Sequence, residues 1–143
     1  MIRILYWNIE KFALNKIANP EQVRTQLGSS ISQARASHDR RDYILDHVGP
    51  LPDHRPELYL YPDVFVVVEV CTGYQNGAAD RGRLASGDGL RGCDALLHEL
   101  RCRQPERGWM LVPPLRTGPN EGVAVFYNSN RLVFTGPWLW PGG

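Results

Sequence analysis

The longest apolar runs of the chain predict β-strands. Residues 2–7 read Ile-Arg-Ile-Leu-Tyr-Trp, a β-branched and aromatic segment that favours a buried strand. Residues 63–70 form a continuous apolar run rather than an alternating one, which is typical of a strand covered on both faces. Three more strands are predicted at 109–112, 122–127 and 132–134, the last of them after a turn at 128–130.

Helical spacing predicts two helices between these strands. Asp39 can cap a helix that ends before the Gly-Pro pair at 49–50. Asp88 can cap a second, amphipathic helix, in which Glu99 precedes Arg103 by four residues, the spacing of an ion pair along one helix. The apolar positions that define these helices are Tyr43, Ile44, Leu45 and Val48 in the first and Leu90, Cys93, Leu96, Leu97 and Leu100 in the second.

The remaining segments are rich in glycine, proline and polar residues. A short helix is expected near 21–27, and the prolines between 50 and 62 enforce an extended connection. The glycine-rich segment 72–92 predicts a mobile surface loop. The order of elements, strand, helix, strand, helix and then strands, is typical of an α/β or α+β sandwich.

Composition narrows the classes of partner. Sixteen basic and fifteen acidic residues leave a net charge of +1, so the 143-residue chain has no global field for nucleic acid, and a polyanion would have to be held locally. No apolar run is long enough to cross a membrane, and no membrane partner is expected. Cys71, Cys93 and Cys102 form no Cys-x-x-Cys pattern, which favours idle thiols in a reducing compartment and a cytoplasmic location.

Two polar residues follow the predicted strands where open sheets bind ligands. Asn8 ends the first apolar segment and Glu69 lies near the end of the valine run. If these strands are parallel neighbours, both side chains lie at one edge of the sheet, and their oxygens suit magnesium or manganese. The alternative is that Glu69 is a carboxylate turned to solvent at a strand end.

Three segments, taken together, resemble motifs of the endonuclease/exonuclease/phosphatase superfamily. They are Arg-Ile-Leu-Tyr-Trp-Asn-Ile-Glu at 3–10, Pro-Asp-Val-Phe-Val-Val-Val-Glu-Val at 62–70 and Glu-Gly-Val-Ala-Val-Phe-Tyr at 121–127. The resemblance implies that Asn8 and Glu69 hold a catalytic divalent metal, and that Glu10 stands where some members carry a further acidic ligand. Val68 departs from the pattern, since many members have Gln before this Glu.

The resemblance also implies that this chain corresponds to one half of the family's fold. Members are four-layered α/β sandwiches, and the second half carries Gly-Asp-x-Asn and Ser-Asp-His motifs that the sequence lacks. We therefore expect residues 1–143 to form one truncated domain of the α/β class, half of a four-layered sandwich with a mixed sheet and flanking helices. The four histidines follow no metal-ligand spacing, so no catalytic base is assigned.

Two functions follow as expectations. The first is a hydrolase of the phosphodiesterase or phosphatase type that needs Mg²⁺ or Mn²⁺ and acts on nucleic acid or another phosphate ester. Arg81 and Arg83 could hold its phosphate, although a solvated charged loop is the other interpretation. The second is a non-catalytic half-domain that binds proteins, by self-association or through a chain carrying the second half, at an edge formed by 132–134, Trp138 and Trp140.

Two further patterns have a structural interpretation. Residues 87–92 match Gly-x-Gly-x-x-Gly, but no strand precedes them directly, so the start of a helix is a better interpretation than a dinucleotide site. Tyr6 and Trp7 could stack on a base, yet their place at the centre of a strand predicts packing in the core.

Overall fold

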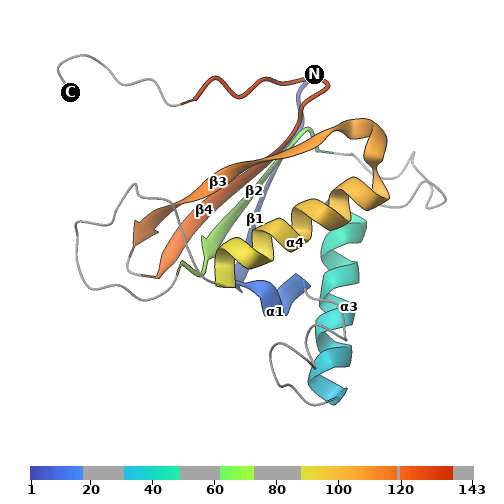
Figure 1. Ribbon diagram of the computed structural model, residues 1–143, viewed down its shortest axis with the longest axis vertical. Coiled ribbons are helices and arrows are strands. Elements are labelled where there is room, and N and C mark those ends of the chain that lie inside the picture. The colour runs from blue at the N-terminus through green and yellow to red at the C-terminus, as the bar shows by residue number, and fades with distance from the viewer. Residues whose placement is uncertain (18–30, 49–61, 73–87, 119, 137–143) are drawn as a thin grey trace.

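The computed structural model describes residues 1–17, 31–48, 62–72, 88–118 and 120–136, and in these residues a mixed sheet lies against helices (Figure 1). The strands are β1 (Ile4–Phe12), β2 (Val64–Val70), β3 (Trp109–Gly118) and β4 (Glu121–Asn128), in the spatial order β1-β2-β4-β3. β1 and β2 are parallel, whereas β4 runs antiparallel to both β2 and β3. The chain is therefore an α/β fold with a mixed sheet, as expected.

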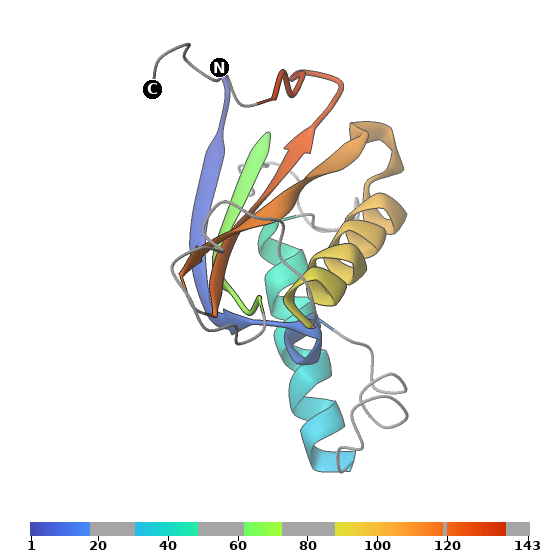
Figure 2. The same ribbon diagram turned by 60° about the vertical axis from the view of Figure 1, so that its left-hand side comes forward.

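The helices lie on one side of the sheet (Figure 2). They are α1 (Leu14–Ile17), α3 (Ile31–Val48) and α4 (Asp88–Arg103), and the short 3₁₀-helix η3 (Pro105–Arg107) follows α4. The core between the two layers contains Phe65, Val67, Ala124, Phe126 and Trp109 from the sheet and Leu45, Val48, Leu96 and Leu100 from the helices. The described residues thus form two layers, and a four-layered sandwich stays a prediction.

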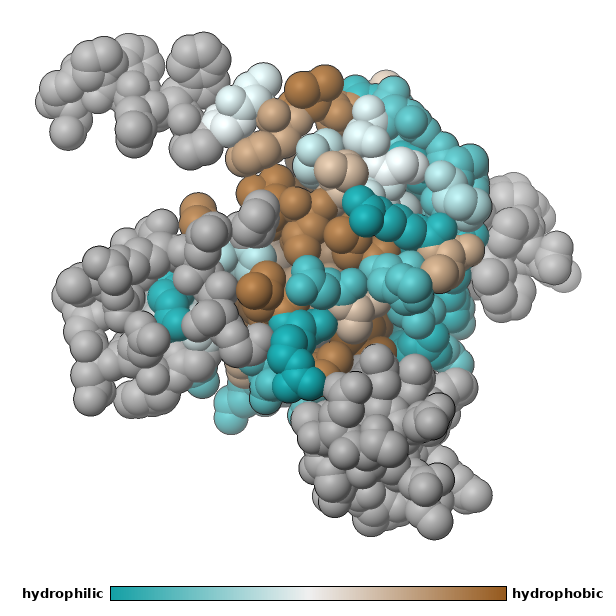
Figure 3. All heavy atoms as spheres, in the orientation of Figure 1, coloured by the Kyte–Doolittle hydropathy of each residue, from teal (hydrophilic) through white to brown (hydrophobic). Residues whose placement is uncertain are grey.

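The opposite face of the sheet is apolar and only partly covered. Ile4 and Tyr6 are 68% and 67% exposed, and Met110 and Leu115 are also exposed on this sheet. Figure 3 shows hydrophobic residues gathered over the strands in the view of Figure 1. The prediction of core packing was therefore wrong for Tyr6, because β1 is an edge strand whose alternate side chains leave the helical layer.

Several predicted boundaries needed correction. The helix expected from Asp39 begins at Ile31, although it ends at Val48 as predicted. Segment 132–134 forms no strand after the turn at 129–131, and β2 is buried on one face only, with its alternate valines half-buried. The expectations for 21–27, for most of the 72–92 loop and for Trp138 and Trp140 lie outside the described residues.

The prediction of an ion pair between Glu99 and Arg103 within α4 was wrong, because both side chains instead pair with residues of α3. The Arg41 guanidinium lies 2.7 Å from the Glu99 carboxylate, and Arg103 lies 2.8 Å from Asp46 and 3.6 Å from Asp42. These arginines are mostly buried, so their partners across the helix interface are screened less than a pair on one solvated helix face. The pairs tie α3 to α4 over the core.

Two glycines of the 87–92 motif let α4 approach the sheet closely. A Cβ placed on Gly89 would lie 2.0 Å from the Cys71 carbonyl oxygen, and one on Gly92 would lie 2.7 Å from the Ala13 carbonyl carbon. The motif therefore serves packing at the start of a helix, which fits the structural interpretation of these glycines. Among the described helices, none is long and apolar enough to cross a membrane.

Candidate functional site

Asn8 and Glu69 meet at the carboxyl ends of the two parallel strands. In the β1–β2 register Asn8 lies opposite Val68, the residue before Glu69. The Asn8 side-chain amide donates a hydrogen bond from Nδ2 to Glu69 Oε1 over 2.7 Å. The prediction that the two residues lie at the same end of adjacent strands is confirmed, and whether they bind a metal stays a prediction.

The backbone turns sharply around this pair. Glu10, Lys11 and Glu69 have φ angles of 50°, 51° and 56°, in the left-handed region that side chains other than glycine rarely adopt. The β1–β2 register shifts between Asn8 and Phe12, so the strain coincides with a bulge. Such strain costs about 1–2 kcal/mol per residue and clusters at functional sites. The strained residues and the polar pair therefore lie at the same end of the sheet.

Hydrogen bonds from the bulge orient both polar side chains. The Glu10 backbone N–H donates to Asn8 Oδ1 over 2.8 Å, which leaves Asn8 Nδ2 directed at Glu69. The Lys11 backbone N–H approaches Glu69 Oε2 at 3.4 Å. The Glu69 carboxylate thus has one firm hydrogen bond and one long contact, and its second oxygen retains capacity for another partner. The pair is held in position without being saturated.

The chemistry of these donors fits a hard cation. Glu69 is half-buried, and Asn8 and Glu10 are exposed, so a ligand has access to their oxygens. Carboxylate and amide oxygens are the ligands that magnesium prefers, and this ion keeps several waters. Among the described residues no three His, Cys, Asp or Glu side chains gather in one metal-binding group. Glu10 contacts the pair through its backbone N–H, which donates to Asn8.

A buried cation that the sequence interpretation missed lies on β3, which continues this end of the sheet. Arg116 is only 5% exposed, and its Nη1 donates to Thr72 Oγ1 over 3.4 Å, three residues after Glu69. Arg116 sits in a strand that also contains two prolines and was predicted to end at Val112. The sequence offered no periodic signal for it, because the bulged part of β3 breaks the alternation.

The other candidate residues fall into separate places. Arg81 and Arg83 lie outside the described residues. Trp7 packs by its ring against Tyr43, His47 and Phe65, which confirms core packing for this residue.

All three cysteines are free. Burial, together with the charge of Asp94, raises the pKa of Cys93 to about 12, so this thiol is a core residue rather than a nucleophile. Burial also raises the pKa of Cys71, whereas Cys102 is exposed.

Comparison of the chain with protein-family models, curated proteins and solved structures gave no match. The site itself is therefore the basis on which a function is inferred.

Proposed function

We propose that this chain supplies the divalent-metal site of a phosphodiesterase or phosphatase-type hydrolase, with nucleic acid as the favoured substrate class. The observation that carries the proposal is the 2.7 Å contact between Asn8 and Glu69 at the carboxyl ends of parallel strands, the place where open sheets bind ligands. The resemblance of segments 3–10, 62–70 and 121–127 to the endonuclease/exonuclease/phosphatase superfamily supports the same residues.

In this proposal each residue has a distinct task. Glu69 would supply the charged oxygen ligand, oriented by the hydrogen bond from Asn8 Nδ2. Asn8 Oδ1 accepts the Glu10 backbone N–H, and its second lone pair would be the neutral ligand. Glu10 offers a second carboxylate that can be recruited, directly or through water, when charge arrives. A bound Mg²⁺ or Mn²⁺ would stabilise negative charge on a phosphate oxygen as a Lewis acid.

The chain is proposed to be catalytically incomplete. Phosphate-ester hydrolysis also needs a group that activates water and a donor for the leaving oxygen. Two histidines have contacts away from the Asn8–Glu69 pair: His47 packs beside Trp7 and Tyr43, and His98 contacts Cys102 on α4. We therefore propose that the base is supplied by a second half of the domain and that residues 1–143 alone are inactive or nearly so.

Calorimetric titration with Mn²⁺ tests the metal site. We expect one weak site in the parent chain and at least a roughly tenfold weaker one in Glu69→Gln, because the neutral amide cannot replace the charged ligand. Glu121→Gln is the matched control, since Glu121 is an exposed carboxylate at the start of another strand of the same sheet. Equal Mn²⁺ binding by Glu69→Gln and the parent would make Glu69 a structural residue and remove the proposal.

A cleavage assay tests the incompleteness separately. A single-stranded oligonucleotide and bis-p-nitrophenyl phosphate, each with Mn²⁺, should remain uncut by the purified chain. Robust cleavage that is lost in Glu69→Gln would support the metal site while contradicting the half-domain interpretation.

The exposed apolar face of the sheet favours a second candidate, a protein-interaction module. Ile4 and Tyr6 on β1, together with Val133 and Phe134 beyond β4, are more than half exposed. Exposed apolar side chains gathered on one face are typical of protein contacts. Self-association or binding of a chain with the second half would cover them. Sedimentation should detect an oligomer that dissociates in an Ile4→Ser, Tyr6→Ser variant, whereas a monodisperse parent monomer would argue against self-association.

A further inference from the structure

A cavity opens at the start of β1, at the end of the strand opposite the Asn8–Glu69 pair. Its volume is about 420 Å³, and it is lined by Met1, Arg3, Ile4, Leu5, His47 and Pro62. This volume is within the range of small-molecule sites in proteins. Because a strand rises about 3.3 Å per residue, Arg3 lies roughly 16 Å along β1 from Asn8. The cavity is therefore distinct from the candidate metal site.

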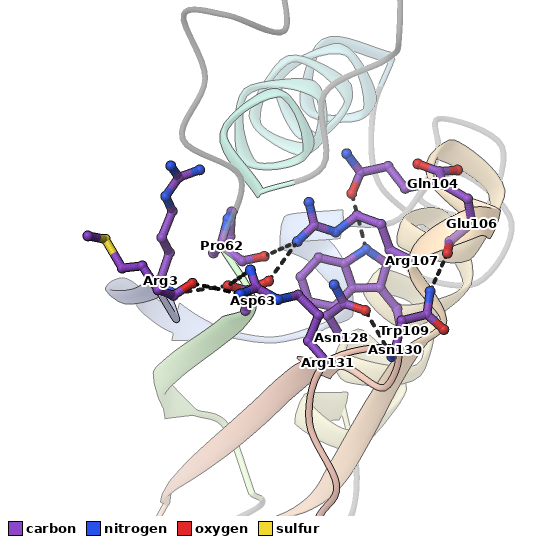
Figure 4. Close-up of polar contacts among 11 residues, drawn as sticks. Arg3, Pro62, Asp63, Gln104, Glu106, Arg107, Trp109, Asn128, Asn130 and Arg131 are labelled. Carbon is purple, nitrogen blue, oxygen red and sulfur yellow. Dashed lines mark hydrogen bonds and ion pairs between the residues drawn. The ribbon is translucent and has the colours of Figure 1, made fainter.

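A buried carboxylate fixes one wall of this cavity. Asp63 is 2% exposed, and its Oδ2 accepts hydrogen bonds from the Arg3 backbone N–H at 3.1 Å and from Arg131 Nη1 at 2.9 Å (Figure 4). The same arginine donates from Nη2 to the Met1 carbonyl oxygen over 2.8 Å. The backbone that carries Met1 and Arg3 is thus tied to a buried anchor.

The other wall is held as firmly. Arg107 Nη2 donates to the Pro62 carbonyl oxygen over 2.8 Å and lies 3.4 Å from Asp63 Oδ1. His47 Nδ1 is 2.7 Å from the Tyr43 carbonyl oxygen, and the His47 ring meets Trp7 edge to face at 5.8 Å. The backbone at Pro62 and the His47 ring are therefore held in place on this side of the cavity.

Arg3 is the arginine among the residues that line this cavity. Asp63 takes only the backbone N–H of Arg3, and its charge is already balanced by Arg107 and Arg131. In Figure 4 the Arg3 side chain points away from Asp63, and no dashed line reaches its guanidinium. Within the described part of the chain no ion pair involves Arg3. An anion bound beside the Arg3 side chain would meet an unneutralised, planar fork of N–H donors.

We propose that this cavity binds an organic monocarboxylate with an apolar body. Met1, Ile4, Leu5 and Pro62 supply apolar walls, and one guanidinium supplies the charge. A guanidinium binds a carboxylate through two parallel hydrogen bonds, and one such contact satisfies both carboxylate oxygens. A phosphate has a third oxygen and more charge, for which these walls offer no second guanidinium. The apolar majority of the lining selects for a hydrocarbon or aromatic body behind the charged end.

Octanoate is a suitable probe, followed by ¹H–¹⁵N correlation spectra of the labelled chain. We expect saturable shifts at Leu5 and His47, and at least about tenfold weaker binding in Arg3→Gln, which removes a charge-assisted contact. Acetate lacks the body and 1-octanol lacks the charge, so each should bind at least about tenfold more weakly than octanoate. Arg91→Gln is the matched control, because Arg91 is exposed and pairs within α4 with Asp88.

The same spectra contain the outcomes that would overturn the proposal. Unchanged octanoate affinity in Arg3→Gln, or shifts centred on Val66 and Val125 of the opposite sheet face, would show that octanoate binds elsewhere. Inorganic phosphate that binds as tightly as octanoate would refute the carboxylate class. Since the Arg3 guanidinium makes no ion pair or hydrogen bond with the described residues, the variant should retain the parent spectrum, and that spectrum separates loss of binding from unfolding.

Discussion

The replacement Asp63→Asn should strongly destabilise the fold, because Asp63 joins segments that are far apart in the sequence. Its carboxylate contacts the Arg3 backbone at the start of β1, Arg107 in η3 and Arg131 beyond β4. The asparagine side chain of the variant could still accept the Arg3 hydrogen bond, but its amide would lack the charge that holds both guanidinium groups. Loss of the ion pair with Arg107 and loss of the ion pair with Arg131 should cost different amounts of stability, because the two arginines differ in exposure.

The magnitude follows from these exposures. Arg131 is 46% exposed and can return to water, so its pair contributes at most about 1 kcal/mol. Arg107 is 16% exposed, and a charge-assisted bond to a buried carboxylate contributes roughly 1.5–3 kcal/mol. We expect Asp63→Asn to lower the free energy of unfolding by about 2–4 kcal/mol at pH 7. Asp88→Asn, a partly exposed control, should cost less than about 1 kcal/mol.

The loss should also depend on pH. Burial by itself raises the pKa of Asp63, but the Arg3 N–H and the charges of Arg131 and Arg107 outweigh it and hold the pKa below its ordinary value. A carboxyl with a lowered folded-state pKa stabilises the fold above its unfolded-state pKa, and this contribution is lost as pH falls through the folded-state value.

Urea unfolding of the parent and Asp63→Asn from pH 7 down to pH 3 measures both effects. The stability difference should be full above about pH 5 and should shrink below about pH 4. A variant as stable as the parent at pH 7, or a difference that stays constant with pH, would refute the electrostatic role of Asp63.

Two further predictions test backbone geometry by urea unfolding. Because Lys11 has a φ of 51°, Lys11→Gly should be more stable than Lys11→Ala by about 0.5–1 kcal/mol. At Ile4 of the same strand, which serves as the control, the Ala variant should be more stable than the Gly variant. If the Ala variant is the more stable one at both positions, Lys11 is not strained. Gly89→Ala should cost about 2 kcal/mol or more because its methyl group would collide with the Cys71 carbonyl, while Gly118→Ala meets only ordinary contacts at 3.4 Å and should cost clearly less. A tolerated Gly89→Ala would show that α4 can move away from β2.

The sequence predicted those elements whose periodicity is continuous. The predicted bounds agree with the observed ones to within a few residues for three elements: β2, α4 and β4. The parallel pairing of β1 with β2 was the condition for bringing Asn8 and Glu69 together, and the structure has this pairing. The prediction failed for the face of β1 that lies away from the helices. Tyr6 was assigned to the core, but the composition of a single strand does not say whether a second layer covers it.

The candidate site was predictable in its residue types and not in its geometry. Asn8 and Glu69 were recognisable as polar residues that follow apolar runs. The bulge at Glu10 and Lys11 was not, because its left-handed residues are not glycines and the sequence therefore contains no sign of them. The Asp63 anchor was likewise hidden, because its partners Arg107 and Arg131 are 44 and 68 residues away in sequence. Long-range pairing of this kind depends on the fold as a whole.

The most direct test of the proposed metal site is paramagnetic broadening by substoichiometric Mn²⁺ in ¹H–¹⁵N spectra of the labelled chain. If Glu69 binds the ion, the amides of Glu10, Lys11 and Val70 should broaden first, and this local effect should disappear in Glu69→Gln. Broadening that is centred on the acidic side chains of α3, Asp42 and Asp46, and is unchanged in Glu69→Gln, would contradict binding at Glu69.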